Sequence, residues 1–293
     1  MNLNKEQQFF IQEKLSAHFN EQITIHSVSN VSGGCINACY TIKTGRGTFF
    51  LKVNDEKKFP GMFAAEARGL ELLQSVCAGF VPSVIKHAAH EGDQFLVLEF
   101  IQSTHPTVHT WKEFARHLSQ LHKNTSGAFG LDQNNYMGSL TQNNSFQNTF
   151  LEFFILQRIA PLLKKAIDKK LLPQDIDKNF QRLYRKLHEI IPAEPPALIH
   201  GDLWSGNFMC DEKGVTKIID PAIAYSHREC DLSMTRLFGG FDSSFYKYYN
   251  DFFLLENGFE KRVDIYNLYP LLVHVILFGG SYPTQVADIM KRF

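Results

Sequence analysis

The chain has 293 residues, of which 44% are hydrophobic and 20% are charged, as in an ordinary globular protein. Its 30 basic and 30 acidic residues cancel, so the composition indicates no nucleic-acid partner. The longest apolar stretch, residues 268–280, contains Pro and His and is too short to cross a bilayer. The N-terminal residues lack the apolar segment of a secretory signal. We therefore expect a cytoplasmic protein without membrane contact.

The first hundred residues are predicted to be rich in strands. Short apolar runs alternate with Gly-containing and Asp-containing turns, which favour antiparallel hairpins. One stretch instead carries apolar residues at a helical period. In chain order, the pattern predicts strands over 24–31, 37–44 and 47–54, a helix over 62–76, and two strands within 83–100 joined at Glu91-Gly92-Asp93.

Helical periods dominate the rest of the chain. Pro161 is expected to kink or end one of these helices. Residues 124–148 are polar and too long for an ordinary connection, so they form either a functional loop or a poorly ordered one. The helices are expected at about 110–123, 149–168, 174–190, 227–237, 242–254 and 260–280.

These elements predict an α+β protein with two lobes. The N-terminal lobe, residues 1–101, is expected to hold a sheet and one helix. The C-terminal lobe, residues 102–293, is expected to be helical. A cleft between two such lobes is a common place for a ligand.

The stretch "HGDLWSGN", followed by "IIDP", carries the most specific chemistry. Phosphoryl transfer needs a carboxylate to accept the proton of the attacking hydroxyl and oxygen ligands for Mg²⁺. Asp202 is the candidate base. Asn207 and Asp220 are hard oxygen donors, which suit Mg²⁺ better than zinc. The order of base, Asn and Asp is typical of kinases.

Two further features agree with nucleotide binding. Lys52 lies in an apolar strand and Glu66 on the next helix, the order in which kinases place the phosphate-binding Lys and its partner. Gly33 and Gly34 lie between two strands, where backbone N–H groups can approach an anion without interference from a Cβ atom. Each feature alone also has a purely structural explanation. Lys52 could extend its charged end to solvent at the edge of the sheet, and the two glycines could form an ordinary hairpin turn.

The sequence resembles the fructosamine kinase, or ketosamine-3-kinase, family within the aminoglycoside-phosphotransferase-like kinases. The resemblance covers nearly the whole chain and rests on its most specific segments, "GGCINACY", "FAAEARGLELL", "FGLDQNNYMGS", "HGDLWSGN", "HRECDLSMTRLFGGF" and "YNLYPLLVHVILFGGSY".

The resemblance implies a two-lobed protein-kinase-like fold that uses ATP and Mg²⁺. It implies phosphorylation of the 3-hydroxyl of a ketosamine, followed by decay of the phosphorylated adduct and release of the amine. The acceptors would be small ketosamines or glycated protein lysines. The backbone around Glu99, Phe100 and Ile101 would hold adenine. The sugar and the oligomeric state stay open.

Some residues near the motif have two possible roles. Trp204 could stack on the acceptor sugar or fill the core. His227 and Arg228 open a helix after Asp220, and Arg228 could hold the acceptor or form a buried ion pair. Asp231 is expected to fix the catalytic loop through hydrogen bonds.

Cys35 follows directly after the two glycines. A thiol beside a cationic phosphate site has a lowered pKa and is open to oxidation. We therefore consider a redox-sensitive loop, with a monomer or a homodimer linked through Cys35, against a plain small loop residue. The other cysteines show no zinc-ligand spacing.

Two other functions compete with the ketosamine kinase. One is a phosphotransferase of the aminoglycoside or choline kinase type, whose cationic acceptors call for an acidic cluster that the stretch "DPAIAYSHRECDL" lacks. The other is a nucleotide-binding scaffold with a kinase fold that no longer catalyses. An intact set of Lys52, Glu66, Asp202, Asn207 and Asp220 argues against the scaffold.

Overall fold

The computed structural model describes residues 3–31 and 36–293. Gly33, Gly34 and Cys35 lie outside the described residues, so the glycine loop and the redox hypothesis stay predictions. Two compact units are present, one of Met1–His105 with Met209–Ile219 and one of Pro106–Phe208 with Asp220–Phe293. A single division near residue 101 was expected from the sequence. The first unit also contains residues 209–219, a hairpin that was expected in the C-terminal lobe.

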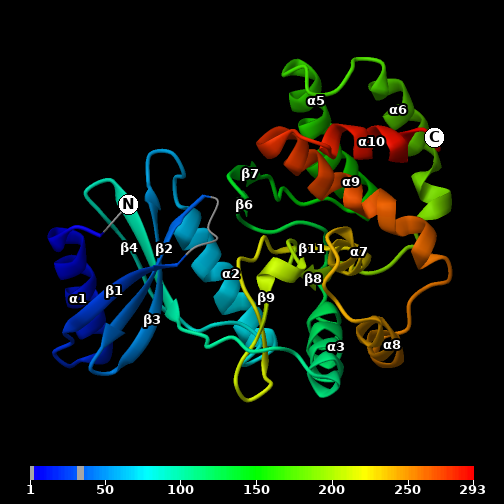
Figure 1. Ribbon diagram of the computed structural model, residues 1–293. Helices are drawn as coiled ribbons and strands as arrows, with labels where there is room; N and C mark the ends of the chain where they lie inside the picture. Colours follow the sequence, from blue (N-terminus) through cyan, green and yellow to red (C-terminus); the bar gives the residue numbers. More distant parts are fainter. Residues whose placement is uncertain (1–2, 32–35) are drawn as a thin grey trace. The chain divides into compact units, whose positions relative to one another are not determined.

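A five-stranded antiparallel sheet forms the centre of the first unit, with strand order β1-β2-β3-β5-β4 (Figure 1). The predicted strands and the predicted helix are all present. Helix α1 was missed, because only Ile11 and Leu15 of its residues are buried and its apolar pattern is weak. The elements are α1 (Lys5–Phe19), β1 (Ile25–Val31), β2 (Ala38–Thr44), β3 (Gly47–Asp55), α2 (Met62–Val76), β4 (Val84–His90) and β5 (Asp93–Glu99).

Both faces of this sheet are covered, and the alternation of β3 explains how. Leu51 and Val53 share one core with Ile11 and Leu15 of α1. Because neighbouring residues of a strand point to opposite faces, Lys52 points away from this core. It meets Glu66 of α2 on the other face. The ion pair therefore follows from the pleat of a strand whose apolar residues face α1.

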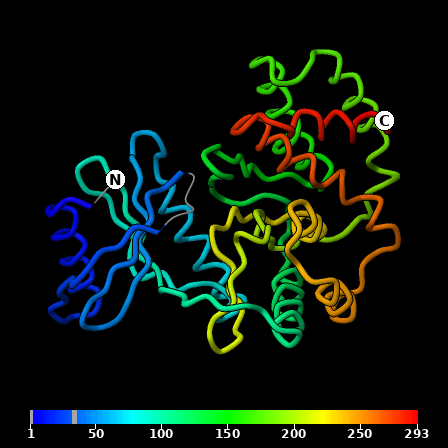
Figure 2. The backbone as a smooth tube through the Cα atoms, viewed as in Figure 1, coloured from blue at the N-terminus to red at the C-terminus, as the bar shows by residue number. Residues whose placement is uncertain are grey.

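Residues 209–219 form a hairpin that belongs to the first unit, and the tube in Figure 2 traces it in yellow. Strands β9 (Phe208–Cys210) and β10 (Thr216–Ile218) form a two-stranded sheet. Thr104 N donates to Cys210 O over 2.7 Å, and Ile218 N donates to Phe80 O over 2.9 Å. The first bond holds the hairpin to the segment that follows β5, and the second holds it to the connection between α2 and β4.

The second unit is mainly helical. A large core joins α4, α5, α6, α9 and α10 and includes Phe153, Phe180 and Leu272. Its elements are α3 (Val108–His122), β6 (Asn135–Met137), β7 (Leu140–Gln142), α4 (Phe150–Phe153), η1 (Phe154–Ile159), α5 (Ala160–Asp168), α6 (Ile176–Ile190), β8 (Ala197–Ile199), η2 (Ser205–Asn207), β11 (Ala224–Ser226), α7 (Glu229–Leu237), α8 (Ser243–Phe252), α9 (Phe259–Phe278) and α10 (Tyr282–Met290).

Three details of this unit differ from the sequence prediction or resolve it. Pro161 does not end its helix, because the chain stays helical from Phe150 to Asp168, on both sides of the proline. A π-helical segment, η1, precedes it. Residues 124–148 are an ordered loop that contains the β6–β7 hairpin. The end of the predicted helix 260–280 is followed by a separate helix, α10, after Gly279 and Gly280.

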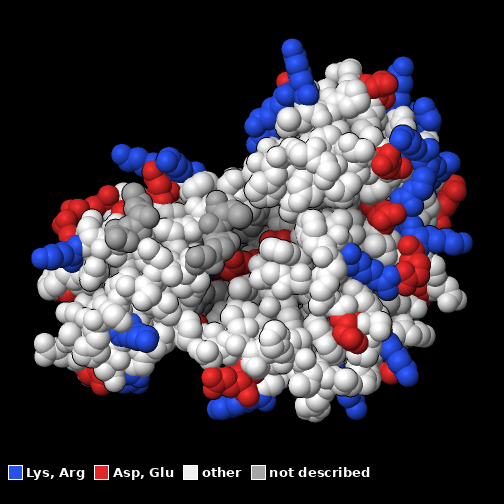
Figure 3. Space-filling model, viewed as in Figure 1, with Lys and Arg blue, Asp and Glu red and all other residues white. Residues whose placement is uncertain are grey.

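Charges of both signs are spread over the face shown in Figure 3. Lys and Arg side chains are most numerous over the region of α5 and α6, where acidic side chains lie between them. No helix within the described residues has the length and apolar character needed to cross a membrane.

Candidate active site

The catalytic loop begins where β8 ends and is held by a carboxylate from α7. His200 N and Gly201 N donate to Asp231 over 2.7 and 2.9 Å. Asp231 is 1% exposed and also contacts His122 Nε2, at 3.2 Å. Asp231 therefore fixes the backbone directly before Asp202, which confirms the role expected for it.

Gly201 allows a close approach between two loops. Its φ is +83°, and a Cβ atom there would lie 2.1 Å from Ala222 O. Any side chain would force the two loops apart. The glycine of "HGD" thus brings Asp202 next to the segment that starts at Asp220.

Asp202 and Asn207 are in direct contact. Asn207 is buried and is the last residue of a short 3₁₀ turn, η2. Its Nδ2 donates to Asp202 O over 2.9 Å and to Asp202 Oδ2 over 3.1 Å. Since Nδ2 is the donor, Oδ1 is the atom of Asn207 that can bind a cation. The turn therefore brings a candidate base and a candidate metal ligand together.

The environment of Asp202 favours its protonated form. Burial and, to a smaller extent, the negative charge of Asp220 raise the pKa of Asp202 to about 7, although the hydrogen bond from Asn207 opposes the rise. A carboxylate with a pKa near neutrality suits proton transfer, because it can accept a proton and release it.

Asp220 has a left-handed backbone conformation, with φ +55°. Such a conformation costs free energy in a non-glycine residue and persists only when the surrounding structure holds it. Asp220 lies two residues after the hairpin strand β10, near the strand end that the apolar run before it predicted.

The residues present fit a magnesium ion. Asp202, Asn207 and Asp220 offer carboxylate and amide oxygens, the ligands that Mg²⁺ prefers. The two carboxylates are close enough for one to raise the pKa of the other. A divalent cation would relieve that repulsion.

The predicted phosphate-binding pair is formed in the first unit. Lys52 Nζ lies 2.6 Å from Glu66 Oε1, and the two side chains are 3% and 11% exposed. A buried Lys needs such a partner to stay charged. The pair belongs to one unit and the carboxylates to the other, so their joint action on one nucleotide stays a prediction.

The segment predicted to hold adenine lines a pocket at the end of β5. Glu99, Phe100 and Ile101 face this pocket together with residues of the 209–219 hairpin. The Glu99 carboxylate lies 3.4 Å from Lys217 Nζ and accepts a hydrogen bond from Ser83 N. The Glu99 side chain is thus engaged with the protein, and its backbone role stays a prediction.

The three tentative substrate residues have different surroundings. Trp204 is 37% exposed and lies edge-on to Phe238, with ring centroids 5.7 Å apart. His227 and Arg228 are both buried. The guanidinium of Arg228 makes two hydrogen bonds to Glu194, at 2.8 and 2.7 Å.

Arg228 also donates to the carbonyl oxygens of Phe253 and Leu254. His227 Nε2 lies 3.2 Å from Pro192 O. The buried ion pair, one of the two alternatives for Arg228, is therefore present. Among the three, Trp204 alone has a side chain open enough to meet an acceptor.

Sequence reasoning missed a group of buried amides that support the site. Asn135, Gln142 and Asn144 come from the loop 124–148, whose order was left open. The clustering of Asn and Gln between two helices was a visible signal, but composition alone does not separate a buried network from a solvated loop.

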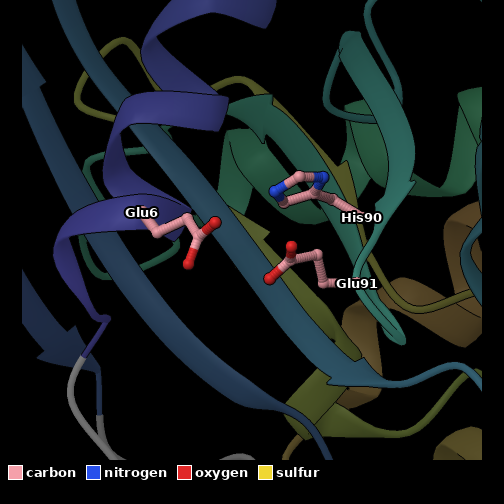
Figure 4. Close-up of side chains that lie close together, drawn as sticks. All are labelled: Glu6, His90 and Glu91. Carbon is pink, nitrogen blue, oxygen red and sulfur yellow. The ribbon is translucent and has the colours of Figure 1, made fainter.

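A separate cluster lies in the first unit. Glu6, His90 and Glu91 each offer a ligand atom, and these atoms lie within 4.8 Å of one another (Figure 4). The ring of His90 stacks on Phe10 with centroids 4.3 Å apart. Both carboxylates are exposed, and exposed groups of this kind are common without an ion. The cluster adds nothing to the chemistry of the catalytic loop.

Comparison with known proteins identifies the family. The family model described as "Fructosamine kinase" matches residues 8–293. The chain belongs to the fructosamine kinase family. It is 36% identical over 265 residues to a probable ketoamine kinase of Enterococcus faecium, with 90% of this chain and 94% of that protein covered.

Solved structures agree with this family and its fold. A putative fructosamine-3-kinase from Haemophilus somnus has a TM-score of 0.89 at 28% identity, with 96% of each chain covered. An aminoglycoside phosphotransferase, solved with AMP-PNP and hygromycin B, has a TM-score of 0.63 at 12% identity, with 96% of each chain covered. The second likeness concerns the fold alone. The predicted α+β, protein-kinase-like fold of this fructosamine kinase family member is confirmed.

Proposed function

We propose that the protein is an ATP-dependent kinase that phosphorylates the 3-hydroxyl of ketosamines. The family membership supports this acceptor class. The observation that carries the proposal is the placement of Asp202, whose carboxylate is in hydrogen-bond contact with Asn207 on a loop that Asp231 holds. Its products would be ADP and a ketosamine 3-phosphate, whose decay would release the amine.

Each residue has one task in this reaction. Asp202 accepts the proton of the attacking hydroxyl and orients its oxygen toward the phosphorus atom. Lys52, kept charged by Glu66, binds the nucleotide phosphates. Asn207 and Asp220 would hold Mg²⁺, which neutralises charge on the phosphoryl group when bound. Asp231 keeps the loop of Asp202 in place.

Small ketosamines and glycated protein lysines both remain acceptors under this proposal. Trp204 offers an exposed aromatic face suited to the C–H surface of a sugar. A panel of acceptors in a coupled ADP-release assay separates ketosamines from aminoglycosides and choline. Turnover of the cationic antibiotics or choline alone would contradict the proposed acceptor.

The Asp202→Asn variant tests the proposed chemistry. We expect phosphoryl transfer to fall by at least about 10²-fold to 10⁴-fold, because the base is lost. Binding of ATP should be nearly unchanged, since the base acts on the acceptor. Asp242→Asn is the matched control, because Asp242 is the exposed N-cap of α8 and Asn caps equally well.

Three outcomes separate the hypotheses. Loss of transfer with retained ATP binding in Asp202→Asn, and full activity in Asp242→Asn, supports the kinase. ATP binding without turnover in the unaltered protein, over the whole acceptor panel, indicates a non-catalytic scaffold. Full activity in Asp202→Asn would show that another group is the base.

A further inference from the structure

A network of buried amides lies behind the segment that carries Asp220. We define the amide network as Asn135, Gln142 and Asn144, whose side chains are 4%, 4% and 0% exposed. All three belong to the second unit and come from the loop between α3 and α4. Buried amides cost free energy unless their hydrogen bonds are made, so their partners show what they hold.

One branch of the network begins at α9 and ends on Ala222. Tyr269 Oη donates to Gln142 Oε1 over 2.6 Å. This bond sets the orientation of the amide, so that Gln142 Nε2 faces Ala222 O at 3.1 Å. The same Nε2 donates to Asn135 Oδ1 over 2.8 Å. Both hydrogens of the Gln142 amide are therefore used.

The other branch begins at η1 and ends on Ile223. Arg158 Nη2 donates to Asn144 Oδ1 over 2.6 Å, and Asn144 Nδ2 donates to Asn135 Oδ1 over 3.1 Å. Asn135 Nδ2 then donates to Ile223 O over 2.8 Å. The two branches thus end on consecutive carbonyl groups, two and three residues after Asp220.

Arg158 is the first donor of this branch, and it sets the orientation of the Asn144 amide. The side chain is 6% exposed and, among the described residues, forms no ion pair with a carboxylate. Its other hydrogen bonds go to the carbonyl oxygens of Asn143 and Gln157. A buried cation polarises the amides to which it donates, which strengthens the chain of bonds.

The segment held by the network needs support from outside. Asp220 has a left-handed backbone, and the carbonyl of Ala222 lies against Gly201 in close approach. Behind this contact is a cavity of about 30 Å³, lined in part by Gln142, Arg158 and Ala222. Close packing therefore does not fill the space behind the segment, and the hydrogen bonds of the network hold it.

We propose that Asn135 and Gln142 are positioning residues that hold Asp220 in place for metal binding with Asn207. The inference rests on the proposed function, because it assigns Asp220 to a metal. Neither amide touches the reacting groups in this assignment. Residues that orient a metal ligand from behind typically change metal affinity by about 10-fold to 100-fold when altered.

The test measures metal binding directly. Mn²⁺ replaces Mg²⁺, and its free concentration is followed by electron paramagnetic resonance in the presence of AMP-PNP. Nucleotide binding without metal is measured by calorimetry in EDTA. The variants are Asn135→Leu, which removes the donor to Ile223 O, and Gln142→Met, which removes the donor to Ala222 O.

Asn267→Leu is the matched control. Asn267 is 3% exposed and donates one hydrogen bond to a backbone carbonyl, Ser233 O, over 2.9 Å. Loss of this hydrogen bond should lower the stability of the protein by a similar amount. Asn267 does not hydrogen-bond to the segment that carries Asp220, so metal binding should be unaffected. Asn135→Asp and Gln142→Glu serve if the first variants do not fold, because they keep size and the accepted bonds but lose the donor.

We expect about 10-fold to 100-fold weaker Mn²⁺ binding in the Asn135 and Gln142 variants, with metal-free nucleotide binding unchanged. The control should keep both affinities. Equal Mn²⁺ affinity in the folded variants, the control and the unaltered protein would overturn the inference alone. An unaltered protein that binds AMP-PNP but no Mn²⁺ would overturn both the inference and the proposed metal role of Asp220.

Discussion

At the scale of single residues, the site depends on groups held in unfavourable states. Asp202 is a carboxylate whose burial and charged neighbour favour the protonated form. Asp220 has a left-handed backbone. Such features persist only where the rest of the fold stabilises them, and they are typical of functional sites.

The raised pKa of Asp202 predicts a trade between stability and activity. Between pH 3.8, the ordinary pKa of the group, and about pH 7, the folded protein keeps the proton on Asp202. The unfolded chain has already lost it there, so this carboxyl makes stability fall as the pH rises through that range. We expect Asp202→Asn to raise the free energy of unfolding by up to about 4 kcal/mol at pH 8 in the absence of ligands, because each unit of pKa difference corresponds to about 1.4 kcal/mol.

Urea unfolding at pH 4 and pH 8 checks this expectation. The advantage of Asp202→Asn should be small at pH 4, which is close to the ordinary pKa of 3.8, and should rise to a constant value above about pH 8. An advantage that does not change with pH would show that the substitution acts through packing instead.

The contact between Gly206 and Trp204 leads to a second prediction, on the binding of the acceptor. A Cβ atom at Gly206 would lie 2.3 Å from the ring of Trp204, so the indole lies directly on the glycine. We expect Gly206→Ala to displace Trp204 and raise the KM for the acceptor several-fold, with the KM for ATP unchanged. Steady-state kinetics with each substrate varied in turn measures both values.

Trp204→Ala supplies the comparison for that result. If Gly206 acts through the indole, Gly206→Ala should change the KM for the acceptor little in a protein that already carries Trp204→Ala. The effects of coupled residues on a measured free energy do not add. Additive effects on the KM for the acceptor would argue against this coupling.

At the scale of elements, α7 connects the catalytic loop to the helical core. Asp231 in its first turn holds the backbone of His200 and Gly201. The helix begins beside Arg228, which joins Glu194 to the carbonyl groups that follow α8. The position of Asp202 therefore depends on a helix that lies far along the chain.

Arg228→Met tests the structural role of this ion pair. Arg228 is 3% exposed and Glu194 is 13% exposed, so the variant leaves a half-buried carboxylate without its partner. We expect a loss of about 3–5 kcal/mol in the free energy of unfolding. Urea unfolding measures the loss.

The double variant Arg228→Met with Glu194→Met should recover part of that loss, because no unpaired charge remains. For the folded fraction at low temperature, the KM for the acceptor should be close to that of the unaltered protein. A large rise in this KM without loss of stability would instead favour a substrate role for Arg228.

At the scale of the whole molecule, two units with separate cores carry the two sets of predicted site residues. The first holds the Lys52–Glu66 pair, and the second holds Asp202, Asn207 and Asp220. A ligand that binds only the folded protein raises its stability by about 2.7 kcal/mol at 100 times its Kd. Nucleotide binding is therefore visible in the stability of the protein.

We expect Lys52→Met to lose most of the stabilisation that Mg-ATP gives to the unaltered protein. Thermal unfolding with and without Mg-ATP measures it. Lys43→Met is the control, because Lys43 is an exposed lysine on the neighbouring strand β2. If Mg-ATP stabilises both variants equally, Lys52 does not bind the nucleotide phosphates.

The sequence by itself determined the kind of chemistry and most of the elements. The period of apolar residues predicted β1 to β5 and α2 because burial on one or both faces imposes that period locally. The motif from His200 to Asn207, with Asp220 after it, predicted a phosphotransferase because few residue types accept a proton and bind Mg²⁺. Helix α1 escaped prediction because its buried face is only a few residues wide.

The tertiary structure decided which groups support those residues. Arg228 had two possible roles in sequence, and its contact with Glu194, 34 residues away, shows the ion pair. Asn135 and Gln142 had no sequence signal for their targets, because Ala222 and Ile223 are 80 or more residues away. Hydrogen bonds between distant segments depend on the folded path of the chain, and a local pattern does not encode that path.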